Sequence, residues 1–192
     1  MSAKNRSQDP IRQGGSGAKP ESWGNIKTPG EHAGPGMREY SGTVLLLTRL
    51  PGVREPEIQD AAALKQIEEQ VAEYFKVKSI LLETFHSSSE EELIEWLHEH
   101  RGAGFLLLNP GELAHTGIQL RNAVQGLGIP FLEIHPACIQ HQETFRHHSI
   151  FSGGAVGILA GLGLRGYLLG AEFAADYLKQ AGVQSKAASN LH

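Results

Sequence analysis

Cysteine is nearly absent from this chain, because Cys138 is the only one among its 192 residues. A lone cysteine excludes an intramolecular disulfide and fits a reducing compartment, so we expect a cytoplasmic protein. Long apolar runs are absent too, since none approaches the roughly 20 residues that a membrane-spanning helix requires. The first residues contain no apolar segment typical of a secretory signal. The sequence therefore predicts no association with a membrane.

Positive charge is scarce as well. Lysine and arginine number 17 against 21 aspartates and glutamates, for a formal net charge of -4, and no basic stripe is present. Nucleic acid is therefore not an expected partner. The composition, with 40% hydrophobic and 20% charged residues, is typical of a globular protein. The 192 residues are enough for one domain with a hydrophobic core.

Glycine and proline gather near the N-terminus. Residues 1–42 hold eight of the 23 glycines and four of the nine prolines, with few aliphatic side chains. Such a segment cannot bury enough apolar area to offset its ordering entropy, so we predict a flexible arm. Trp23 and Ile26, in "ESWGNI", make it a candidate docking peptide for a protein partner, and the simpler alternative is an unused tail.

From Thr43 onward, short aliphatic runs alternate with amphipathic segments. Strands are expected at 43–47, 79–82, 104–108, 130–134 and 155–161, and helices at 61–75, 87–100, 116–128 and 167–178. Continuous apolar strands alternating with helices are typical of a parallel sheet covered on both faces. We therefore predict a flavodoxin-like, three-layer α/β fold with a five-stranded sheet of order 2-1-3-4-5. In such folds the ligand binds at the carboxyl ends of the strands.

The stretch "GLGLRG" (161–166) has the glycine spacing of a dinucleotide fingerprint, but its context differs. It lies in the last α/β unit, so no second strand follows it, and no strand-end acid lies about 20 residues downstream to bind a ribose. We interpret these glycines as sites of close helix–sheet packing, and we expect neither nicotinamide nor flavin.

Polar side chains follow the predicted strands at the edge where a ligand would bind. The carboxylate of Glu133, two residues before His135 in "FLEIH", can orient the imidazole and stabilise its charged form. The histidines lie on different loops without close ligand spacing, so no metal is expected. Each residue alone has a plain structural explanation, but together the following favour a site: Arg54, Asn109, His115, Glu133, His135 and Arg146.

An ordered series of motifs resembles the type II 3-dehydroquinate dehydratase family, the dehydroquinases of the shikimate and quinate pathways. The motifs are "REPEI", "ELIEWLH", "NPG-x-x-x-HT", "EIH", "FRHHS" and "GLG-x-x-GYLL". The resemblance covers residues 43–180 and leaves the arm, 1–42, and a tail, 181–192, outside it. It implies a flavodoxin-like subunit, trimers assembled into a homododecamer, and no cofactor.

The resemblance also implies a reaction, the anti elimination of water from 3-dehydroquinate through an enolate. In the family a lid tyrosine, activated by an arginine, removes the proton, and a histidine protonates the departing hydroxyl. By this resemblance the catalytic residues are His135 as general acid, Glu133 as its supporting carboxylate and Arg54 as the lid arginine. The expected substrate-binding residues are Asn109, His115 and Arg146.

Departures from the family pattern fall where the chemistry would occur. Gln59 stands in the place of the tyrosine base, and a neutral amide cannot accept a proton from carbon. Asp60 is the only obvious substitute. After His135 the family has main-chain donors and a serine for the substrate carboxylate, but here Pro136 has no N–H and Ala137 has no hydroxyl.

Three functions fit these residues. The first is a family member that has lost dehydration and serves as an oligomeric scaffold or binding module, with the arm suited to multivalent docking. The second is an active dehydratase with His135 as acid and Asp60 as a substitute base. The third is another lyase or binding activity for a ligand without a carboxylate, which would not need the N–H that Pro136 removes.

Overall fold

The computed structural model describes residues 42–50 and 61–181. Arg54, Gln59 and Asp60 therefore lie outside the described residues, as do almost all of the predicted arm and tail. Within the described ranges, no helix has both the length and the apolar character needed to cross a bilayer.

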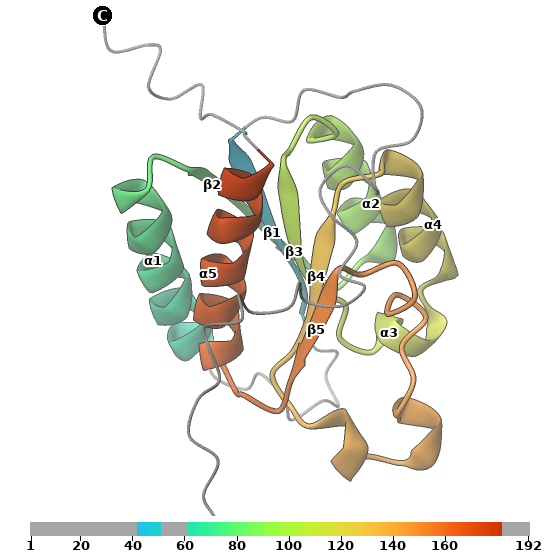
Figure 1. The fold of residues 1–192 in the computed structure, drawn as a ribbon. Helices are drawn as coiled ribbons and strands as arrows, with labels where there is room; N and C mark the ends of the chain where they lie inside the picture. The colour runs from blue at the N-terminus through green and yellow to red at the C-terminus, as the bar shows by residue number, and fades with distance from the viewer. Residues whose placement is uncertain (1–41, 51–60, 182–192) are drawn as a thin grey trace, which may run out of the picture.

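Five parallel strands form one sheet in the order β2-β1-β3-β4-β5, which confirms the predicted topology (Figure 1). Each strand is short and most are dominated by aliphatic or aromatic side chains. Their bounds are β1 Thr43–Arg49, β2 Leu81–Ser87, β3 Phe105–Asn109, β4 Phe131–His135 and β5 Gly157–Ala160. Because β1 and β3 lie inside the sheet with helices on both sides, their leucines are fully buried.

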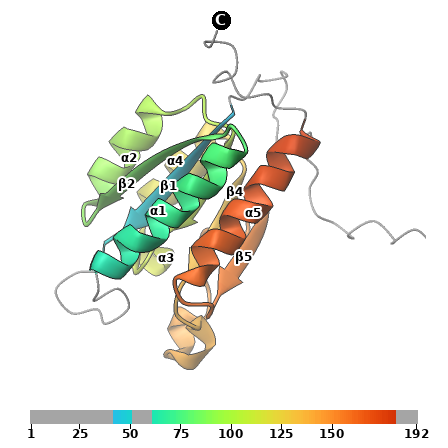
Figure 2. The ribbon, with the colours of Figure 1, turned by 90° about the vertical axis from the view of Figure 1, so that its left-hand side faces the viewer.

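Helices cover both faces of the sheet and complete the predicted three layers. On one face lie α1 (Ala61–Val77) and α5 (Arg165–Gln180), which pack on each other and appear in front of the sheet in Figure 2. On the other face lie α2 (Glu90–Glu99) and α4 (Ile118–Leu127). Two separate apolar cores result, one beneath each helix pair.

The second strand differs from its prediction, since it runs over Leu81–Ser87 and not over 79–82. Ser79 has a positive φ of 57°, so it belongs to the turn that follows α1. The strand then continues through Glu83 and Thr84, because β2 is an edge strand whose outer positions remain exposed. An apolar pattern alone could not locate such a strand.

The helix predicted at 116–128 is in fact two helices, the short α3 (Leu113–Thr116) and α4. Gly117 joins them at a tight corner, where a Cβ atom would lie 2.8 Å from Cβ of Leu113. Two 3-10 turns in the loop after β4, at Ile139–His141 (η1) and Thr144–Arg146 (η2), were also not predicted.

The first four residues of "GLGLRG" form the turn between β5 and α5, and its last two begin α5. Gly161 and Gly163 have positive φ values of 77° and 57°, which favour glycine. The N–H of Gly161 donates to the carbonyl of His135 at 3.0 Å, and the N–H of Gly163 donates to that of Pro136 at 2.9 Å. This turn therefore holds the chain where it leaves β4, next to the candidate site. At Gly166 a Cβ atom would lie 3.5 Å from Cγ2 of Ile134, an ordinary packing distance, so close helix–sheet packing does not require this glycine.

Candidate functional site

Two neighbouring strands end at the candidate site, β3 at Asn109 and β4 at His135. The carboxyl ends of parallel strands share one edge of the sheet, which is the usual ligand edge of this architecture. Asn109, Glu133 and His135 are all buried there, with 3%, 0% and 7% of their surface exposed. The structure thus brings together three of the six residues that the sequence singled out, and His115 follows in α3.

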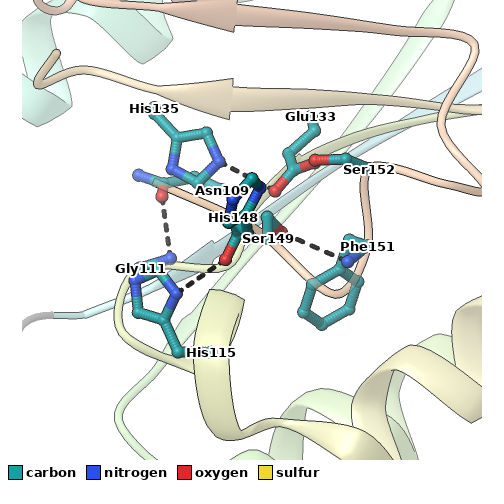
Figure 3. Close-up of polar contacts among 9 residues, drawn as sticks. All are labelled: Asn109, Gly111, His115, Glu133, His135, His148, Ser149, Phe151 and Ser152. Atoms are coloured by element: carbon teal, nitrogen blue, oxygen red, sulfur yellow. Dashed lines mark hydrogen bonds and ion pairs between the residues drawn. The ribbon is translucent and has the colours of Figure 1, made fainter. Parts of the chain in front are cut away.

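A carboxylate–imidazole pair lies at the end of β4. His135 Nε2 donates to Glu133 Oε1 at 2.8 Å, and the Ser152 hydroxyl donates to Glu133 Oε2, also at 2.8 Å. In Figure 3 the Glu133 carboxylate lies between the His135 ring and Ser152. Because Nε2 is engaged with the carboxylate, Nδ1 is the ring nitrogen left to exchange a proton with a ligand.

The environment keeps Glu133 ionised. Burial by itself raises the pKa of this carboxyl, but hydrogen bonds from His135, Ser149 and Ser152 and the charge of His135 outweigh it. The net effect is a pKa below the ordinary value of 4.5. An ionised carboxylate accepts from the imidazole and fixes its orientation, which a histidine that exchanges a proton with a ligand requires.

The side-chain amide of Asn109 is fixed at both ends. Its Oδ1 accepts from the N–H of Gly111 at 3.0 Å, and its Nδ2 donates to the hydroxyl of Tyr167 at 2.7 Å. A backbone N–H can only donate, so it must face the oxygen of the amide and not the nitrogen. The Asn-Pro-Gly turn therefore sets the orientation of Asn109.

The polar residues at this edge belong to opposite faces of the sheet. Glu133 pairs with Leu108, whose side chain lies in the α2/α4 core, so Glu133 and His135 belong to that face. Asn109 pairs with Thr48 and bonds to Tyr167 of the α1/α5 core. A ligand that contacts both Asn109 and His135 must therefore lie across the strand ends.

His115 is held by the loop that precedes β5. Its Nδ1 donates to the carbonyl of His148 at 3.0 Å (Figure 3). The N–H of Ile150 donates to the carbonyl of Ala114 at 2.8 Å. Since a carbonyl can only accept, Nδ1 carries the hydrogen, and Nε2 is the acceptor when the ring is neutral.

The remaining predicted residues have different environments. Arg146 lies in η2, where its Nε is 3.2 Å from Glu143 Oε2 in a partly exposed ion pair. Arg54 lies outside the described residues. Pro136 and Ala137 continue directly from β4, and their carbonyls accept hydrogen bonds from Gly163 and Gly161.

Sequence reasoning did not identify Ser152 or Tyr167 as members of the site. Ser152 is 19 residues from Glu133 in the chain, and no local sequence pattern predicts the contact between them. Tyr167 lies among the apolar positions of α5 and would be assigned to the core. No three His, Cys, Asp or Glu side chains in the described part of the chain gather as they would around a metal ion.

Comparisons with known proteins show the family of this chain. The family model described as dehydroquinase class II matches residues 47–175. A 3-dehydroquinate dehydratase from Pasteurella multocida is 38% identical over 130 residues, covering 67% of this chain and 88% of the relative. Another from Haemophilus influenzae strain PittGG is 41% identical over 128 residues, covering 66% and 86% respectively.

Solved structures give the same answer for the fold. A type II dehydroquinase from Propionibacterium acnes superposes with a TM-score of 0.60 at 31% identity, covering 72% of this chain and 99% of its own. One from Butyrivibrio crossotus DSM 2876 gives a TM-score of 0.62 at 25% identity, covering 70% and 97%. The flavodoxin-like fold is therefore shared with these structures.

Proposed function

Because this chain belongs to the class II dehydroquinase family, we propose that it binds a dehydroquinate-like ligand but has lost its rapid dehydration. It then serves as a binding module or scaffold. The observation that carries this proposal is that the general acid of the reaction is present but its general base is not. The acid half, His135 backed by Glu133 and Ser152, is assembled and buried, whereas Gln59 stands where the family has its base.

The retained half supports binding and proton donation. Asn109 and His115 present side chains of fixed orientation, and His135 can offer Nδ1 to a hydroxyl of the ligand. Elimination also requires removal of a proton from carbon, which an amide cannot perform. Loss of a general base alone lowers a rate by roughly 10²–10⁴-fold.

The pocket for the ligand carboxylate is expected to be weaker than in the family. Pro136 has no N–H to donate, and Ala137 has no hydroxyl. A lost hydrogen bond to a charged group costs about 1.5–3 kcal/mol, or roughly 10- to 150-fold in affinity. A ligand without a carboxylate remains an alternative occupant, and it would be unaffected by these two residues.

Assembly is part of the proposal. Family membership supports a homo-oligomer, with trimers and a homododecamer as its specific form, in the cytoplasm. Exposed aliphatic side chains on β5, on the turn after it and on α5 support an interface: Ile158, Leu162 and Leu169. Residues 1–42, repeated on such a core, would provide a multivalent arm for a protein partner.

One specific observation favours an active dehydratase as a second candidate. Glu133 is wholly buried, ionised and hydrogen-bonded to His135, an arrangement that proton donation uses and that a scaffold does not need. In that case Asp60 would act as the substitute base, and Asp60→Asn would abolish turnover.

The test is conversion of 3-dehydroquinate by the purified full-length protein, followed by the ultraviolet absorbance of the enone product, with binding measured by calorimetry. We expect binding, with turnover at least about 10²-fold below an ordinary kcat of about 10 s⁻¹. Turnover within tenfold of that value would overturn the proposal. Absence of binding would overturn its ligand-binding part.

Restoring the missing base gives a sharper prediction. Gln59→Tyr should raise turnover by at least about 10²-fold, since the acid half of the site is already built. Gln59→Phe is the matched control, because it adds the ring without the hydroxyl and should gain nothing. Equal effects of the two variants would show that the base is not what the site lacks.

A further inference from the structure

A row of polar side chains crosses the α1/α5 face at the carboxyl edge of the sheet. His86, Thr48 and Asn109 are register partners on three adjacent strands, so their side chains point to the same face. Glu68 of α1 and Tyr167 of α5 come from the two helices that cover that face. The mainly apolar core beneath this row makes its polar composition unusual.

Contacts link these residues in pairs. His86 Nε2 lies 2.6 Å from Glu68 Oε1, and Asn109 Nδ2 donates to the Tyr167 hydroxyl at 2.7 Å. Thr48 and Tyr167 are both wholly buried. The Thr48 hydroxyl is a polar neighbour of the Tyr167 phenol and lowers its pKa, but Thr48 Oγ1 has no regular hydrogen-bond partner among the described residues.

Tyr167 is the residue that organises the row around Asn109. Burial raises the pKa of its phenol, and although Asn109 and Thr48 lower it, the net pKa is above the ordinary value of 10.0. The hydroxyl therefore keeps its hydrogen at any working pH. Its oxygen accepts from Asn109 Nδ2, and Thr48 is the other polar side chain beside it.

His86 lies too far from the acid histidine to serve the same ligand. It is on β2 and His135 is on β4, three strand spacings away in the order β2-β1-β3-β4. At about 4.8 Å per spacing the separation is about 14 Å, beyond the length of a small ring acid. A small ligand that contacts His135 therefore meets this row at Asn109, its member nearest to β4.

We infer that Tyr167 is a positioning residue that fixes the amide of Asn109 for a ligand. With Oδ1 facing Gly111 and one Nδ2 hydrogen on Tyr167, the second Nδ2 hydrogen has no partner among the described residues. Asn109 thus donates to the ligand, and the group that it selects is an acceptor oxygen, such as a hydroxyl or carbonyl. The statement about a ligand rests on the proposed function, whereas the arrangement of Tyr167 and Asn109 does not.

Side-chain amide NMR tests the arrangement without a ligand. In the wild-type protein, one hydrogen of Asn109 Nδ2 should exchange with water at least about tenfold more slowly than the other, because only one is bonded to Tyr167. Tyr167→Phe should remove that difference while keeping the ring in the core. Equal exchange of the two wild-type hydrogens, or an unchanged difference in Tyr167→Phe, would overturn the inference.

Tyr177→Phe is the matched control, because Tyr177 lies on the same helix and its ring packs in the same core against Phe105. It should leave the Asn109 exchange rates unchanged. For the ligand, calorimetry with 3-dehydroquinate should give a dissociation constant about tenfold weaker in Tyr167→Phe and within twofold of wild type in Tyr177→Phe. Equal weakening in both variants would overturn the positioning role. If the wild-type protein does not bind 3-dehydroquinate, the proposed function fails, and amide exchange still decides the role of Tyr167.

Discussion

At the scale of single residues, the site is defined by which hydrogen bonds are already made. Glu133 is buried and ionised because three donors surround it, and through it His135 is held in one orientation. Asn109 is equally constrained by Gly111 and Tyr167. Fixed polar groups of this kind bind a ligand without a further ordering cost, which is why they matter for function as well as for stability.

A first prediction concerns Glu133. Folding lowers the pKa of this carboxyl, so its ionised form stabilises the protein above pH 4.5, and this contribution is lost as the pH falls through the lowered pKa. Glu133→Gln should therefore cost about 2 kcal/mol at pH 7, and the difference from wild type should shrink as the pH falls below 4.5. Urea unfolding at several pH values measures it.

The matched control for Glu133 is Glu143→Gln, since Glu143 is an exposed carboxylate in η2's N-terminal flank. That variant should change the unfolding free energy by less than about 0.5 kcal/mol at every pH tested. A difference between wild type and Glu133→Gln that stays constant from neutral to acid pH would contradict the assignment of an ionised, stabilised Glu133.

At the scale of elements, local sequence signals decide where α2 begins. Ser89 caps α2 by accepting from the N–H of Glu92, and three glutamates occupy the first turn, where the helix dipole favours negative charge. The Ser87 hydroxyl adds a second link, because it donates to the Glu92 carboxylate at 2.5 Å and accepts from the N–H of Ser89. The start of α2 is therefore well specified.

Removing the cap gives the second prediction. Ser89→Ala should destabilise the protein by about 1 kcal/mol, because the N–H of Glu92 loses its acceptor. Ser88→Ala is the control, since Ser88 is exposed beside the cap and should change the unfolding free energy little. Chemical unfolding of the three proteins distinguishes them, and equal stability of both variants would show that the Ser89 cap contributes nothing.

At the scale of the whole molecule, the proposed oligomer and the proposed arm are separable. The exposed aliphatic side chains offered for assembly, on β5, on the turn after it and on α5, all belong to the folded domain and not to the arm. The N-terminal residues are instead polar and rich in glycine and proline. Assembly should therefore not depend on the arm, which would be left for partners.

The third prediction follows from this separation. Deleting residues 1–41 should leave the number of subunits in each particle unchanged. Light scattering should then give a particle mass that is lower only by the mass of the missing segments. The control is a variant in which a Gly/Ser segment of equal length replaces residues 1–41. It separates the effect of the size of the segment from the effect of its sequence. Dissociation of the deletion variant into smaller particles would assign the arm to assembly and remove the scaffold-arm proposal.

Much of the fold could be predicted from the sequence because apolar periodicity reports directly on burial. The continuous runs in β1 and β3 predicted buried parallel strands, and the helix faces followed from the 3.6-residue spacing. Predictions failed where exposure or tight packing overrode that periodicity. The edge strand β2 carries polar residues at partly or fully exposed positions. Gly117 lies at a corner between α3 and α4 where a Cβ atom would lie 2.8 Å from Cβ of Leu113.

The sequence by itself determined the family, the strand order, and which side chains end β3 and β4. Only the tertiary structure decided that Asn109 and His135 belong to opposite faces of one edge, and that Ser152 and Tyr167 hold them. The reason is that hydrogen-bond partners here are separated by 19 and 58 residues of chain. Such contacts arise from packing of the sheet and its helices, and local pattern does not encode them.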